Sequence, residues 1–118
     1  MIDISEAKKI GEMLAALGEP TRMRLIEQLT QGSQYVGELA DVLGVPMVNV
    51  SHHLGVLRNA GLIEATKQGR RVSYSIFPDI FTASRAQDAI GTLQIGSYRL
   101  TICRNGNAAK PEKSKRRG

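Results

Sequence analysis

Aromatic residues are scarce in this chain of 118 residues, which has three tyrosines, two phenylalanines and no tryptophan. Proteins that read single-stranded RNA stack the bases on exposed aromatic rings, so this composition argues against that class. The single cysteine excludes an intramolecular disulfide framework and any zinc site built from several cysteines. No apolar run approaches the roughly 20 residues that a membrane-spanning helix requires.

The first residues also lack the basic and then apolar stretches of a secretory signal, so we expect an intracellular, cytoplasmic protein. No Gly-rich phosphate loop, Cys–His or Ser–His–Asp arrangement is recognisable, which argues against an enzyme and provides no cofactor site. The length is that of one domain, and the hydrophobic fraction of 42% is typical of a globular chain with one core.

Positive charge is concentrated in the middle and at the end of the chain. Residues 1–48 hold four basic and seven acidic groups, whereas residues 49–71 hold four basic groups and one acidic group. A basic zone on an otherwise acidic domain suits a polyanionic partner. Apolar residues almost vanish in residues 105–118, so we expect a disordered basic tail after a domain that spans residues 1–104.

Helical periodicity covers the first half of the chain. Four helices are expected, at about 5–17 with Ser5 as the cap, 20–30, 38–43 and 46–59. Prolines open the second and fourth helices, and glycines end the first and third. In the fourth helix Val50, Leu54 and Leu57 repeat at i, i+4 and i+7, which predicts the buried face.

The second half of the chain changes to alternating hydrophobicity. Residues 62–77 predict a β-hairpin whose basic tip includes Gly69, Arg70 and Arg71. Residues 79–91 are weakly helical in pattern. Residues 92–102 are typical of strand, but the apolar phase shifts at Gly96-Ser97. Either a bulge in one strand or the two-residue turn of a small hairpin accounts for this shift.

Two short helices at about 37–60, followed by a basic hairpin at about 62–77, predict a winged helix-turn-helix. The fold class is therefore mainly α with a small β-hairpin (α+β). A helix of this kind enters the major groove of DNA, where Asn pairs with adenine, and an Arg further along the helix is better placed for a phosphate. The candidate DNA contacts are Met47, Asn49, Ser51, His52 and Arg58 on the fourth helix, and Arg70 and Arg71 on the wing.

Four stretches resemble, in this order, the ArsR family of bacterial winged-helix repressors: residues 16–22, 37–40, 50–54 and 56–63. The resemblance covers residues 8–77. It implies a homodimer that places two recognition helices in successive major grooves of a palindromic operator in double-stranded DNA. It also implies dimer contacts from the first and last helices. In this chain the last element is strand-like, and the candidate dimer residues on the first helix and on that segment are Ile10, Leu14, Leu93, Ile95, Leu100 and Ile102.

The chain departs from this family at the positions that hold metal in many members. Tyr35 and Gly37 occupy the places of a Cys-x-Cys pair, and residues 79–102 contain no histidine for the alternative C-terminal site. His52 and His53 are adjacent, so a helix points them in different directions, and they are poor ligands for one metal. We therefore expect no metal site, and we interpret Cys103 as a small apolar residue at a strand end.

A different class of function stays open at this point. A winged helix that binds another protein, without reading DNA, would carry apolar residues on its recognition helix. Met47 and Val48 favour that alternative, whereas Asn49, Ser51 and His52 favour DNA.

Overall fold

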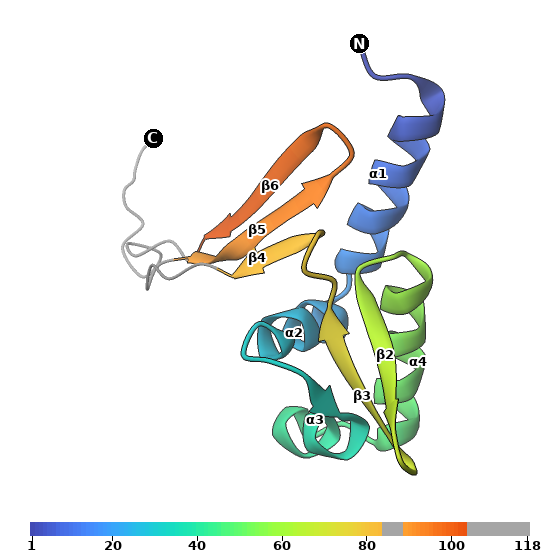
Figure 1. Ribbon diagram of the computed structural model, residues 1–118, viewed down its shortest axis with the longest axis vertical. Coiled ribbons are helices and arrows are strands. Elements are labelled where there is room, and N and C mark those ends of the chain that lie inside the picture. Colours follow the sequence, from blue (N-terminus) through green and yellow to red (C-terminus); the bar gives the residue numbers. More distant parts are fainter. Residues whose placement is uncertain (84–88, 104–118) are drawn as a thin grey trace.

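The computed structural model describes residues 1–83 and 89–103, so the expected tail at 105–118 lies outside the described residues. Four helices and a first sheet form the larger part of the molecule, and a second sheet lies beside the first helix (Figure 1). The helices are α1 (Ile4–Leu17), α2 (Pro20–Leu29), α3 (Val36–Leu43) and α4 (Met47–Asn59). All four lie where the apolar periodicity predicts them.

Local capping sets the ends of these helices. Asp3, and not Ser5, is the cap of α1, because its carboxylate accepts a hydrogen bond from the Glu6 amide at 2.8 Å. At the end of α3, Gly44 adopts a left-handed conformation with φ 68°, and its amide donates to the Ala40 carbonyl at 2.9 Å. A residue with a side chain adopts this conformation at a cost, so glycine suits the turn that redirects the chain into α4.

The first sheet is the predicted wing with one short strand added. It consists of β1 (Gln34–Tyr35), β2 (Ile63–Gln68) and β3 (Arg71–Ile76), in the order β1-β3-β2 with antiparallel pairing. Gln68 and Arg71 form the last pair of the β2–β3 ladder, so Gly69 and Arg70 make the turn at the tip. The hairpin prediction for residues 62–77 is confirmed.

The second sheet corrects the helical expectation for residues 79–91. Its strands are β4 (Phe81–Ala83), β5 (Ala89–Ile95) and β6 (Tyr98–Cys103), in the order β4-β5-β6. Residues 81–83 pair with residues 91–93, and this pairing overrides a weak local preference for helix. Residues 84–88 lie outside the described part of the chain.

The phase shift at Gly96-Ser97 is a hairpin turn, which decides between the two alternatives left open by the sequence. Ile95 pairs with Tyr98 across the turn, and Gly96 has a positive φ of 58°. The carboxylate of Glu6 accepts a hydrogen bond from the Ser97 amide at 2.8 Å. This contact fastens the turn of the second sheet to the first turns of α1.

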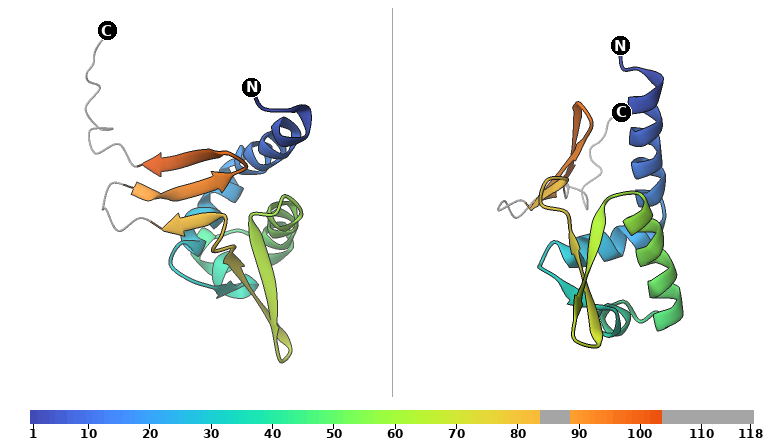
Figure 2. Two further views of the ribbon diagram at one scale, coloured as in Figure 1. Left: turned by 45° about the horizontal axis from the view of Figure 1, so that its top comes forward. Right: turned by 45° about the vertical axis from the view of Figure 1, so that its right-hand side comes forward.

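One hydrophobic core joins both parts of the molecule, and Figure 2 shows the second sheet alongside α1. Its largest fully buried side chains come from every helix, from the start of the wing and from β5: Met13, Leu25, Ile26, Leu39, Val50, Leu54, Leu57, Leu62, Ile63, Leu93 and Ile95. Strand β5 therefore packs into the same core as the helices and the start of the wing.

No helix within residues 1–83 and 89–103 is long and apolar enough to cross a membrane.

We expect Gly96→Ala to lower the free energy of unfolding by roughly 1–3 kcal/mol, because a side chain at this φ is strained. An added Cβ would also lie 2.7 Å from a carboxylate oxygen of Glu6. Gly55→Ala is the matched control: it lies within α4, its Cβ would meet nothing within 4 Å, and it should raise stability by about 0.5–1 kcal/mol. Urea unfolding at one fixed protein concentration measures both, and equal midpoints for the two variants would contradict the docking of the turn.

Candidate nucleic-acid interface

Helix α4 is anchored by one face and open on the other. Val50, Leu54 and Leu57 are fully buried, as the periodicity predicts. The start of α4 and the wing tip lie at the same end of the molecule, far from the second sheet (Figure 1). The helix N-terminus and a basic hairpin are therefore presented together.

The first turns of α4 expose four of the candidate contact residues. Met47, Asn49, Ser51 and His52 are all exposed. Asn49 and His52 are three residues apart, so they lie on neighbouring positions of one helix face. An amide, a hydroxyl and an imidazole together supply donors and acceptors for base edges in a major groove.

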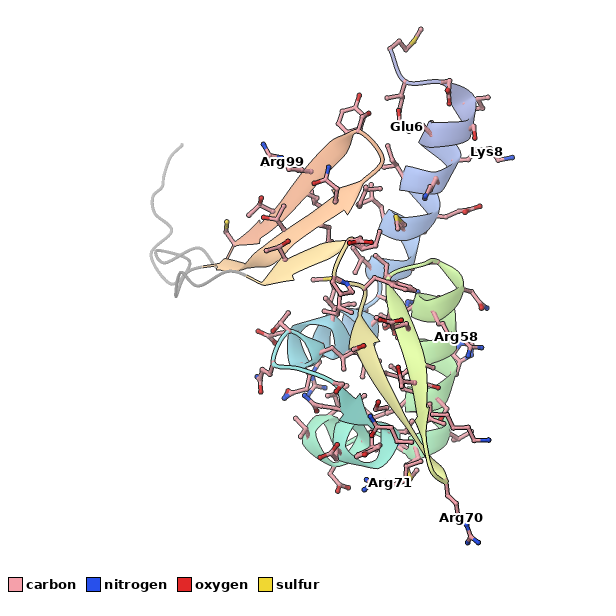
Figure 3. The ribbon with its side chains drawn as sticks, in the orientation of Figure 1. Glu6, Lys8, Arg58, Arg70, Arg71 and Arg99 are labelled. Atoms are coloured by element: carbon pink, nitrogen blue, oxygen red, sulfur yellow. The ribbon has the colours of Figure 1, made fainter. Side chains whose placement is uncertain are left out.

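Arg58 lies at the opposite end of α4 from the wing tip (Figure 3). It is exposed and sits in the last turn of the helix, 11 residues beyond Met47. At about 1.5 Å of rise per residue, this places it some 16 Å along the axis from the helix start. Such a distance separates Arg58 from the exposed candidate residues in the first turns of α4.

The two wing arginines have different surroundings. Arg70 is exposed at the tip and projects away from the body of the protein (Figure 3). The guanidinium carbon of Arg71 instead lies 3.5 Å from the centroid of the Tyr35 ring. Arg71 therefore makes a cation–π contact within the protein, whereas Arg70 is turned fully outward.

Tyr35 is a residue of this region that sequence reasoning did not assign to it. Its hydroxyl donates to the side-chain oxygen of Gln68 at 2.7 Å, and its ring lies beneath Arg71. No local pattern signals this contact, because Tyr35 and Gln68 are 33 residues apart in sequence.

His53 and Arg22 belong to the fold and not to the exposed surface of α4. A guanidinium nitrogen of Arg22 lies 3.2 Å from Nδ1 of His53, and Nε2 of His53 lies 3.9 Å from a carboxylate oxygen of Glu19. Arg22 also donates to the Ala16 carbonyl at the end of α1. These contacts join α1, α2 and α4, and they place His53 against the start of α2.

The cap of α2 contributes to the same junction. The Arg22 amide donates to the Glu19 carboxylate at 3.0 Å, and this hydrogen bond, aided by His53, lowers the pKa of Glu19. A lowered pKa means that the stabilisation is present above the unfolded pKa and is lost as the pH falls through the folded one. The junction is therefore weakened by acid.

No group of three or more His, Cys, Asp and Glu side chains is arranged to hold a metal ion within residues 1–83 and 89–103. The rings of His52 and His53 meet edge to face, with centroids 5.2 Å apart. Of the two positions where the resemblance would place a Cys-x-Cys pair, Tyr35 contacts the wing, and an added Cβ at Gly37 would meet nothing within 4 Å. Cys103 is an exposed free thiol at the end of β6.

The far end of the molecule carries an apolar groove of about 340 Å³ between α1 and β6, lined by Ile2, Ile10, Leu14, Ile95, Tyr98, Arg99 and Leu100. Leu14 is 43% exposed, Tyr98 52% and Leu100 40%. Leu93 and Ile95, expected at a dimer contact, are instead buried within the chain itself. The side chain of Ile102 lies outside the described residues.

Comparison with known proteins identifies the same unit. A helix-turn-helix domain family matches residues 17–66. The transcriptional regulator NmtR of Mycobacterium tuberculosis is 36% identical over 89 residues, which cover 75% of this chain and 73% of that protein. The transcriptional repressor SmtB of the same species is 41% identical over 66 residues, and the matched part is 56% of this chain and about half, 49%, of SmtB.

A solved structure shares both the fold and the sequence pattern. It is the homodimeric winged helix-turn-helix DNA-binding domain of a possible ArsR-family regulator from Mycobacterium bovis. The TM-score is 0.59 at 28% identity, and the match covers 64% of this chain and 72% of that one. With the buried face of α4, the basic wing and these relatives in agreement, the chain belongs to the ArsR/SmtB family of winged helix-turn-helix transcriptional regulators.

Proposed function

We propose that this protein binds double-stranded DNA in a sequence-specific manner, as a homodimer, and represses transcription by occupying a palindromic operator. The observation that carries the proposal is the exposed polar start of α4 beside an outward-pointing arginine at the wing tip. A regulator of this kind acts by occupying a site, so the proposal includes no chemical step.

The surroundings of each side chain indicate whether it suits a contact with bases or with phosphates. Asn49, Ser51 and His52 are exposed on the first turns of α4, where a helix meets base edges in the major groove. Arg70 and Arg58 are exposed at separate places and suit the phosphates on either side. The exposed apolar pair Met47 and Val48 is adjacent to this polar set and suits contacts with thymine methyl groups.

We assign the dimer contact to the end of the molecule opposite the wing. Leu14, Tyr98 and Leu100 leave apolar surface uncovered around the groove between α1 and β6. In the described part of the second sheet, β6 is an edge strand that pairs only with β5. A second copy of the chain would cover both, and the homodimeric M. bovis domain supports this occupant.

Replacing Asn49 tests base reading. Asn49→Ala should weaken binding to the preferred duplex by roughly 1–3 kcal/mol and leave binding to random duplex nearly unchanged. Asn59→Ala removes the same group from an exposed position at the other end of α4 and should have little effect. The duplex is first selected from random sequences, and affinities follow by fluorescence anisotropy. A protein that selects no sequence would refute the proposed function.

Replacing Arg70 tests the phosphate contact of the wing. Arg70→Ala should reduce the slope of log K against log salt concentration by about 0.9 for each lost contact, or about 1.8 for a dimer. Lys8→Ala removes one positive charge from an exposed position on α1, on the side away from β6 (Figure 3), and serves as the control. Identical slopes for both variants would mean that the wing tip does not touch DNA.

A charge placed in the groove between α1 and β6 tests the dimer contact. Leu14→Glu should give monomers at micromolar concentration, because a buried unpaired carboxylate opposes association. Val42→Glu introduces the same group at a 58% exposed aliphatic position on α3 and should leave the dimer intact. Sedimentation equilibrium measures the mass of each variant, and a dimeric Leu14→Glu protein would move the interface elsewhere.

A further inference from the structure

The side chain of Tyr35 contacts both residues of the last pair in the wing ladder. Gln68 and Arg71 are direct partners across the β2–β3 ladder, and only Gly69 and Arg70 lie beyond them. The Tyr35 hydroxyl donates to the Gln68 side chain at 2.7 Å. The Arg71 guanidinium carbon lies 3.5 Å from the centroid of the same ring. Tyr35 therefore touches both strands of the wing immediately below the tip.

The backbone of Tyr35 is itself held in place. Tyr35 pairs with Ser73 in the β1–β3 ladder, and its amide donates to the carboxylate of Glu38 at 2.8 Å. Glu38 lies in the first turn of α3. The backbone of Tyr35 is thus held from two sides, by Glu38 of α3 and by Ser73 of β3.

The wing needs support at this level. The third strand, β1, pairs only with Tyr74 and Ser73 of β3. Closer to the tip, the wing is a two-stranded ribbon, and such ribbons are at best marginally stable in water. The side chain of Tyr35 extends the contact of β1 to the next residues along the wing.

Arg70 and Arg71 are adjacent in sequence, but their side chains lie in different places. Arg71 lines a hollow of about 370 Å³ with Tyr35, Val36, Gly37, Met47 and Val72, between the wing and the starts of α3 and α4. Arg70 projects from the tip (Figure 3). The charge of Arg71 is therefore held over the Tyr35 ring at the start of α3, and Arg70 provides the charge at the tip of the wing (Figure 3).

We propose that Tyr35 is a positioning residue of the DNA interface. It fixes the wing relative to α4, so that Arg70 meets the phosphate backbone while the first turns of α4 occupy the major groove. Because the wing is ordered before DNA arrives, binding does not carry the full entropic cost of ordering it. This inference rests on the proposed function.

A first experiment examines the free protein by NMR. Side-chain protons of Arg71 that lie over the Tyr35 ring should show an upfield ring-current shift. Tyr35→Phe should retain this shift, because the ring remains, whereas Tyr35→Leu should abolish it. An Arg71 side chain with ordinary chemical shifts in the unaltered protein would overturn the proposal without any reference to DNA.

A second experiment examines binding to the selected duplex. Tyr35→Phe removes only the hydroxyl that reaches Gln68 and should weaken binding roughly threefold to tenfold, with a greater loss for Tyr35→Leu. Both should lower the salt slope and weaken hydroxyl-radical protection where the wing contacts DNA. Both Tyr35 variants should still prefer the selected duplex over random duplex, and Asn49→Ala should still lower that preference. Tyr74→Phe removes a hydroxyl from the same hairpin and is the matched control, expected to keep the wing protection.

The outcomes separate this inference from the proposed function. Tyr35 variants with unchanged affinity, salt slope and footprint, but a lower urea midpoint, would limit Tyr35 to stability and overturn the proposal. Tyr35→Phe keeps this test decisive if Tyr35→Leu fails to fold. A protein with no preferred sequence would refute the proposed function instead, and the salt slope on a random duplex would still decide the role of Tyr35.

Discussion

The burial of one face of α4 is the constraint on which the rest of the molecule depends. Val50, Leu54 and Leu57 have no solvent exposure, and helices α1, α2 and α3 and strand β2 all contact this helix. A helix held so firmly along one face keeps its opposite face open in a fixed direction. The polar start of α4 is therefore presented on a helix that the core holds along its opposite face.

The two ends of the molecule expose different surfaces. The end with the wing tip carries amide, hydroxyl, imidazole and guanidinium groups beside the exposed apolar pair Met47 and Val48, whereas the end with the second sheet leaves apolar side chains around a groove. The first end suits DNA, which is a polyanion, and the second end suits the apolar surface of another copy of the chain. The separation allows one chain of 118 residues to contact both partners at once.

Sequence patterns predicted the parts of this structure that depend on near neighbours. All four helices, the buried face of α4 and the basic hairpin follow from residues a few positions apart. The strand β4 was missed because its order comes from pairing with β5, and the contact of Tyr35 with Gln68 joins residues 33 apart. The sequence pattern also placed Leu93 and Ile95 at the dimer contact, whereas they are buried within the chain itself. Alternating hydrophobicity predicts that one face of a strand is buried, but it does not show whether the same chain or a second copy covers that face.

A rigid path connects the two ends, and this has a consequence for recognition. Glu6 of α1 holds the turn of the second sheet, and the end of α1 is tied through Arg22 to His53 of α4. If two copies meet along α1 and β6, the separation and angle of the two α4 helices are set by this path and not by a flexible linker. A rigid dimer accepts only half-sites whose spacing matches its own geometry, about one or two helical turns of DNA apart. The side chains that never touch DNA would then select the spacing of the operator, while those on α4 select its bases.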